Sequence, residues 1–189
     1  SANLSGQLSP TDAAHVLKDL DGKIPMILDG GLCPGGIEST VIDLSTDHPR
    51  LLRPGLLSLV ALEEAIGPIE RDIPQMQNDE VLLSPGMLTQ HYAPRTPLLH
   101  GSVGDVQKLL DEGKRIGYLQ YSNTKIDHKD VFSIKMPNDA AAYAARLYQE
   151  LHGLDERKLD VIVVELPPET DEWLGVRDRL MRAAVKDGS

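Results

Sequence analysis

The chain has 189 residues, of which 41% are hydrophobic and 25% charged, a balance that predicts a packed core and excludes a disordered chain. Its net charge of −10, together with the lack of any dense run of Lys or Arg, disfavours direct RNA binding by this chain. The longest apolar runs, such as Val161 to Val164, are far shorter than the roughly 20 residues that cross a bilayer, so we expect no membrane segment and a cytoplasmic protein. A single cysteine, Cys33, cannot form an internal disulfide or build a zinc cluster.

The first third of the chain alternates short helical and extended patterns. Ser9 is predicted to be the N-cap of an amphipathic helix, with Pro10 at the first helical position and Gly22 at its end. Ser58 is predicted to cap a second helix that stops at Gly67. Three strands are expected between these helices, over residues 25–28, 39–44 and 51–53.

A change of pattern follows. Residues 68–97 lose the hydrophobic period and carry recurrent prolines, which predicts a linker with a restricted backbone. From residue 98 strands alternate with helices, which implies a largely parallel sheet covered by helices. The expected strands are residues 98–101, 116–121, 131–136 and 161–165, and the expected helices are residues 103–112, 139–152 and 172–186. We therefore predict an α/β protein with units at residues 1–67 and 98–189.

The glycine-rich loop at residues 30–36 has two interpretations. A phosphate-binding loop would need a Lys and a Ser or Thr opening a helix, whereas a strand is expected to follow here, so a plain turn is favoured. Asp29 and Glu38 flank the loop and offer a metal ligand or a base, but acids beside loops are more often solvated or capping. His15, beside the apolar stripe of the first helix, is expected to be a partly buried structural residue.

Small polar side chains gather in the first part of the chain and in the linker. Arg53 offers a planar fork of donors suited to a phosphate or carboxylate, and Pro54 and Gly55 would hold it at a strand end. The alternative is that Ser9 only caps its helix, that Ser39 lies on a sheet face, and that Arg53 forms a surface ion pair. Spacing alone favours this alternative.

Several consecutive motifs together resemble one family. Ser-Ala-Asn-Leu-Ser-Gly, Ser-Pro-Thr, Leu-Asp-Gly-Gly, Gly-Ile-Glu-Ser-Thr-Val-Ile-Asp-Leu and Leu-Leu-Arg-Pro-Gly follow one another in the order of the later half of a YrdC-like catalytic domain. Ser-Pro-Gly-Met and His-Tyr-Ala-Pro resemble the interdomain linker of the two-domain threonylcarbamoyl-AMP synthases. Residues 98–189 resemble the smaller Rossmann-like C-terminal domain of that family.

The resemblance implies a reaction in which L-threonine, bicarbonate and ATP give threonylcarbamoyl-AMP and pyrophosphate, which other proteins use to modify adenosine in tRNA. ATP is then a substrate, with Mg²⁺ as a candidate companion. The resemblance also implies roles for individual residues. Ser1 and Ser9 contact the nucleotide, with Asn3 nearby; Ser39 contacts threonine; Arg53 contacts the phosphates or adenylate; and Tyr92, with His91, closes over the site from the linker.

The same resemblance divides the chain into the C-terminal portion of a YrdC-like domain (1–67), a linker or lid (68–97) and the Rossmann-like domain (98–189). The chain opens at Ser1 without an initiator Met, and the family's earlier, phosphate-binding half is absent from it. We therefore expect an inactive or nearly inactive chain that self-associates through exposed sheet edge and core. The alternative is a non-catalytic module that binds a nucleotide or a partner.

Overall fold

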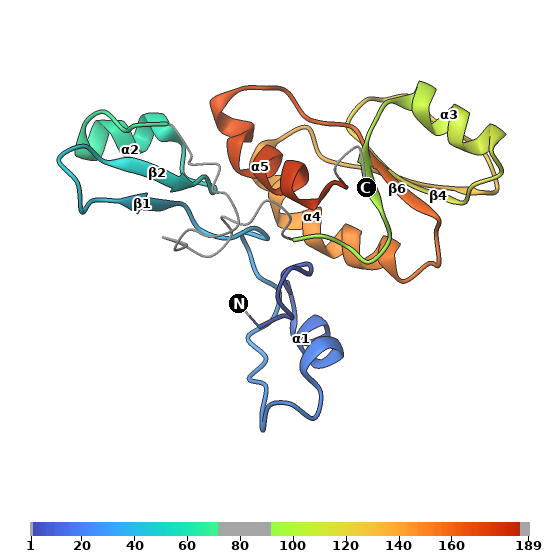
Figure 1. Ribbon diagram of the computed structural model, residues 1–189, viewed down its shortest axis with the longest axis horizontal. Helices are drawn as coiled ribbons and strands as arrows, with labels where there is room; N and C mark the ends of the chain where they lie inside the picture. The colour runs from blue at the N-terminus through green and yellow to red at the C-terminus, as the bar shows by residue number, and fades with distance from the viewer. Residues whose placement is uncertain (1, 72–91, 186–189) are drawn as a thin grey trace.

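The computed structural model describes residues 2–71 and 92–185 of the chain (Figure 1). In the first part, helix α1 (Ala13–Leu20) is followed by strands β1 (Val41–Asp43) and β2 (Arg50–Arg53) and by helix α2 (Leu59–Ile66). β1 and β2 pair antiparallel. The predicted ends of α2 are confirmed, because the Ser58 hydroxyl accepts a hydrogen bond from the Ala61 amide at 3.2 Å and Gly67 ends the helix at φ 85°.

Two predictions for the first part are wrong. The N-cap of α1 is Asp12, whose carboxylate accepts from the His15 amide at 2.9 Å; Asp caps as well as Ser and lies directly before the apolar stripe. Residues 25–28 form no strand, and Met26 and Leu28 are 70% and 85% exposed. No strand within residues 2–71 or 92–185 pairs with this segment, so its backbone gains no ladder hydrogen bonds.

The second part is a parallel sheet covered on both faces. Its strands run in the order β3-β6-β4-β5, with every neighbouring pair parallel. Helix α3 packs on one face through Val106, and helices α4 and α5 pack on the other (Figure 1). The elements are β3 (Leu98–His100), α3 (Val103–Asp111), β4 (Ile116–Gln120), β5 (Val131–Lys135), α4 (Ala140–Asp155), β6 (Val161–Val164), the 3₁₀ turn η1 (Asp171–Trp173) and α5 (Leu174–Ala183). The predicted α/β class and parallel sheet are confirmed.

The largest hydrophobic core belongs to both parts of the chain. Leu147 and Leu151 of α4 and Leu180 of α5 form this core with sheet residues, and Leu8 and Tyr92 join it from outside the sheet. The first part is therefore fixed to the α4–α5 face by apolar burial, which contributes about 25 cal/mol per Å². Among the helices of the described residues, none combines the length and apolar character needed to span a membrane.

Candidate functional site

Arg53 lies at the end of β2 and is buried, with 8% of its surface exposed. Its Nε donates to the Ser39 carbonyl at 3.1 Å, and its Nη1 donates to the Tyr92 hydroxyl at 3.3 Å. The surface ion pair considered from the sequence is therefore wrong. Arg53 instead joins the segment before β1 to Tyr92, which lies near the end of the linker.

Tyr92 is held in an unusual backbone conformation. Its φ is 61°, in the left-handed region that few residues other than glycine adopt, and only 2% of its surface is exposed. Its ring lies 6.0 Å from that of Tyr148 and 5.3 Å from the guanidinium carbon of Arg179. Burial and the charge of Glu38 raise the pKa of the Tyr92 hydroxyl despite Arg179 and Arg53, so it stays neutral at physiological pH.

Glu38 is the centre of a second hydrogen-bonded group. Its carboxylate accepts from the Ser9 hydroxyl, from Tyr148 at 3.2 Å and from Arg179 Nε at 2.7 Å. Burial alone would raise the pKa of Glu38, but the Arg179 charge and the Ser9 hydrogen bond outweigh it and leave the pKa below its usual value of 4.5. Glu38 is therefore an ionised, partnered carboxylate, neither the solvated acid nor the cap that its loop position suggests.

Glycines at two contacts let the loop before β1 and the loop after β2 approach helices α4 and α5 closely. Gly36 has φ 72°, and a Cβ there would lie 2.1 Å from the Ala144 carbonyl oxygen of α4. A Cβ on Gly175 of α5 would lie 2.5 Å from the carbonyl oxygen of Gly55. Both contacts are shorter than any real side chain allows, so the glycine-rich loop serves here as a close packing turn.

A cavity of about 320 Å³ opens beside the Ser9–Glu38 pair. It is lined by Ala2, Ser9, Cys33, residues 35–37 and Glu38. Its volume lies at the lower end of the range for small-molecule pockets, and the hydrogen-bonded Ser9 and Glu38 side chains belong to its lining. The candidate site comprises this cavity and the Arg53–Tyr92 pair, which Arg179 and Glu38 connect to it.

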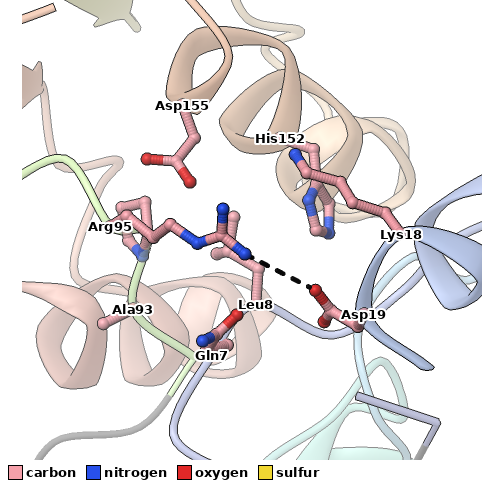
Figure 2. Close-up of a pocket in the computed structure, with 9 residues that line it drawn as sticks. Gln7, Leu8, Lys18, Asp19, Ala93, Arg95, His152 and Asp155 are labelled. Atoms are coloured by element: carbon pink, nitrogen blue, oxygen red, sulfur yellow. Dashed lines mark ion pairs between the residues drawn. The ribbon is translucent and has the colours of Figure 1, made fainter. Parts of the chain in front are cut away.

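Segments from α1, from the end of the linker and from α4 meet at a separate junction (Figure 2). Arg95, near the end of the linker, reaches toward Asp19 of α1, with 3.8 Å between the charged atoms. His152 and Asp155 of α4 face the same space. The cavity there is only about 10 Å³, too small for more than a single water. It is therefore a packing junction and not a ligand site.

His152 connects this junction to the candidate site. Its Nε2 lies 3.1 Å from the Ser9 carbonyl oxygen, and its ring stacks on that of His15 with 3.7 Å between centroids. Burial and the neighbouring His15 lower the pKa of His152, so the ring is neutral near pH 7. The expected structural role of His15 is consistent with this half-buried stack.

The sequence-predicted residues are only partly brought together. Ser9, Arg53 and Tyr92 belong to the two connected groups, and the exposed Ser39 lies at their edge, contributing its carbonyl to Arg53. The Asn3 amide donates to the carbonyls of Leu4 and Gln7 and so shapes a turn. Ser1 and His91 lie outside the described residues.

Sequence reasoning missed Arg179 and Tyr148. The available signal was Arg179 itself, which falls on the apolar stripe of the last helix, three residues after Val176 and four before Ala183. A charge on a buried stripe requires a buried partner. Its partner, Glu38, is 141 residues away, and no local pattern links the two.

The fold and site define a two-part α/β protein with a buried polar site where a strand pair meets the helices of a parallel sheet. The family model described as threonylcarbamoyl-AMP synthase, C-terminal domain, matches residues 57–185, and the model described as telomere recombination matches residues 1–55. The chain belongs to the threonylcarbamoyl-AMP synthase family.

Its similarity to known members extends over nearly all of this chain. It is 41% identical to the threonylcarbamoyl-AMP synthase of Bacillus subtilis and 34% identical to that of Schizosaccharomyces pombe, in each case over 97% of this chain but over 56% and 51% of the relative. The crystal structure of P. abyssi Sua5 complexed with L-threonine superimposes with a TM-score of 0.82 at 36% identity, covering 97% of this chain and 56% of that one. The chain thus spans about half the length of these relatives.

Proposed function

We propose that this chain forms one side of the substrate site of a threonylcarbamoyl-AMP synthase, which converts L-threonine, bicarbonate and ATP to threonylcarbamoyl-AMP and pyrophosphate. The observation that carries the proposal is that buried Arg53 donates to the Ser39 carbonyl and the Tyr92 hydroxyl. Arg179 and Glu38 connect this group to the cavity lined by Ser9. The P. abyssi relative, whose structure was determined with L-threonine, supports the same substrate class.

In this proposal Ser1, Ser9, Arg53 and Tyr92 contact ATP or the adenylate, and Ser39 contacts threonine. The guanidinium of Arg53 supplies a charge-assisted donor for a phosphate or a carboxylate. Tyr92, neutral and buried, presents its hydroxyl beside that donor. Mg²⁺ would accompany the phosphates of ATP, as it does where substrate phosphates supply most of its ligands.

We propose the division into residues 1–67, the linker 68–97 and residues 98–189, with the linker as a lid that excludes water from a carbamate and a mixed anhydride. Adenylate formation concentrates negative charge, and within the described part of the site Arg179 is already neutralised by Glu38. We therefore expect the 189-residue chain alone to show little or no synthase activity. In the cell we place it in the cytoplasm with the tRNA-modification machinery, and exposed Met26, Leu28 and Leu32 would favour self-association.

Calorimetric titration of the chain with ATP, with and without L-threonine, tests the substrate site. Arg53→Ala is expected to weaken binding at least about tenfold, because a hydrogen bond to a charged group contributes ~1.5–3 kcal/mol. Arg50→Ala is the matched control, since Arg50 lies on the same strand but pairs with Glu70 at 3.4 Å on the surface. No binding of ATP even with L-threonine present, or equal effects of the two variants, would reject this site and favour a non-catalytic partner-binding module.

A further inference from the structure

Arg179 of α5 contacts both segments that carry the proposed ligand contacts. Its side chain is 0% exposed. Nη2 donates to the carbonyl of Glu38 at 3.1 Å, and Nη1 donates to the carbonyl of Pro54 at 2.8 Å. Glu38 directly precedes Ser39, and Pro54 directly follows Arg53. One planar guanidinium therefore sets the spacing between the backbones that hold Ser39 and Arg53.

The Arg179 guanidinium also orients the other two proposed ligand contacts, Ser9 and Tyr92. Nε of Arg179 binds the Glu38 carboxylate, which in turn accepts from the Ser9 hydroxyl. Its guanidinium carbon lies 5.3 Å from the centre of the Tyr92 ring, within cation–π range. Arg179 thus contacts Tyr92 directly, and it reaches Ser9, Ser39 and Arg53 through one intervening residue, Glu38 or Pro54.

Neighbours in the second part of the chain hold Arg179 itself in place. Asp178 accepts from Nη1 of Arg179 at 2.7 Å and from Nε of Arg182 at 2.9 Å. The contact of Gly175 with Gly55 brings α5 close enough for the guanidinium to reach both carbonyls. At least four of the five N–H donors of Arg179 therefore bond to protein acceptors, so Arg179 is poorly placed to bind a ligand.

A buried ion pair is a poor source of stability, because well-packed apolar residues of similar volume are often equally or more stabilising. The stripe of α5 around Arg179 is otherwise apolar, with Val176, Leu180 and Ala183. A methionine at position 179 would fill similar space without desolvating a charge. What it could not do is hydrogen-bond two carbonyls and a carboxylate at fixed geometry.

We infer that Arg179 is a positioning residue for the substrate site, through which the second part of the chain fixes Ser9, Ser39, Arg53 and Tyr92. This inference rests on the proposed function, and it assigns the C-terminal part a direct role in ligand recognition. The inference also separates the effect of the Glu38–Arg179 ion pair on stability from its effect on ligand recognition. Replacing both partners together should leave the fold intact but change the geometry of the substrate site.

The test compares Arg179→Met with the double variant Glu38→Gln/Arg179→Met. The single variant leaves the Glu38 carboxylate buried and unpaired, so we expect a large fall in the urea midpoint. The double variant should recover most of that midpoint yet bind ATP and L-threonine at least about tenfold more weakly than the unmodified chain. Arg177→Met is the control, because Arg177 lies on the same helix but donates to the Pro167 carbonyl and pairs with Glu169.

A ligand-free readout keeps the inference separate from the proposed function. The Arg53 Nε–H, which donates to Ser39, should give a protected signal in nitrogen-15 NMR of the unmodified chain and of Arg177→Met, and lose that protection in the double variant. Protection retained in the double variant, or unchanged ligand affinity, would overturn the positioning role. If the unmodified chain shows the protected signal but binds neither ligand, the proposed function fails, while the NMR comparison still decides the role of Arg179.

Discussion

Replacing Gly175 by alanine tests how closely α5 must approach the site. The new Cβ would lie 2.5 Å from the Gly55 carbonyl oxygen and 3.1 Å from Ile37 Cδ1. Because the first of these is backbone, relief requires α5 or the loop after Arg53 to move. Overpacking of this kind costs ~1–3 kcal/mol, whereas the better helix propensity of alanine returns only ~1 kcal/mol. We expect a net destabilisation of about 1 kcal/mol.

Gly153→Ala is the matched control, since Gly153 lies in α4 and a Cβ there meets nothing within 4 Å. That variant should be stabilised by ~0.5–1 kcal/mol through helix propensity alone. Urea unfolding measures both, because each kcal/mol moves the midpoint by about 0.3–1 M for a protein of this class. The two substitutions should shift the midpoint in opposite directions. A midpoint that rises in both variants would show that the Gly55–Gly175 contact is not tight, and would refute the reasoning.

Three further outcomes are expected. The pKa of His152 is lowered in the folded chain, so the unfolded chain binds a proton at His152 more readily, and the unfolding free energy should fall as pH drops below the ordinary value of 6.5. His152→Gln should weaken this dependence of the unfolding free energy on pH, as measured by urea titrations at several pH values. An unchanged pH dependence in this variant would contradict the prediction. Hydrogen bonds from Ser102 lower the pKa of Asp105 to about 2, so Asp105→Asn should lower the melting temperature at pH 7 but have no effect below pH 2. An equal change of melting temperature at the two pH values would contradict this prediction. Tyr92→Phe keeps the ring but removes the hydroxyl that accepts from Arg53 Nη1, and calorimetry should show ATP affinity falling several-fold with little change in melting temperature. Loss of stability alone would assign Tyr92 a packing role.

Hydrophobic periodicity predicted the second part of the chain well because its helices and strands each carry a clear local pattern of apolar residues. The run Val161–Val164 is buried on both faces, as its unbroken apolar sequence indicates, and the β/α alternation leads directly to parallel pairing. The Ser58 and Gly67 signals also identified both ends of α2, because caps act within a single turn.

The failures lie where a local signal has a distant competitor. Ser9 has the right identity for an N-cap, but its hydroxyl is used by Glu38, 29 residues away, and Asp12 takes the cap. The short apolar run at residues 25–28 is consistent with a strand, yet a strand requires a neighbour to pair with. For the site, motif resemblance named Ser9, Arg53 and Tyr92, which the structure connects, but it did not indicate that Arg179 connects them. Long-range ion pairs leave no periodic pattern in a sequence.

The contacts between Gly36 and Ala144 and between Gly55 and Gly175 also constrain how such a chain can be inherited or recombined. A chimera joined within the linker would bring together loops and helices that never adapted to each other. A larger residue at one of these glycines, or a carboxylate at position 38 without an arginine at position 179, would disrupt the packing between the two parts even if each part folded well. Productive exchange between relatives therefore requires that the loop and helix partners move as matched sets, although they lie more than a hundred residues apart in the chain.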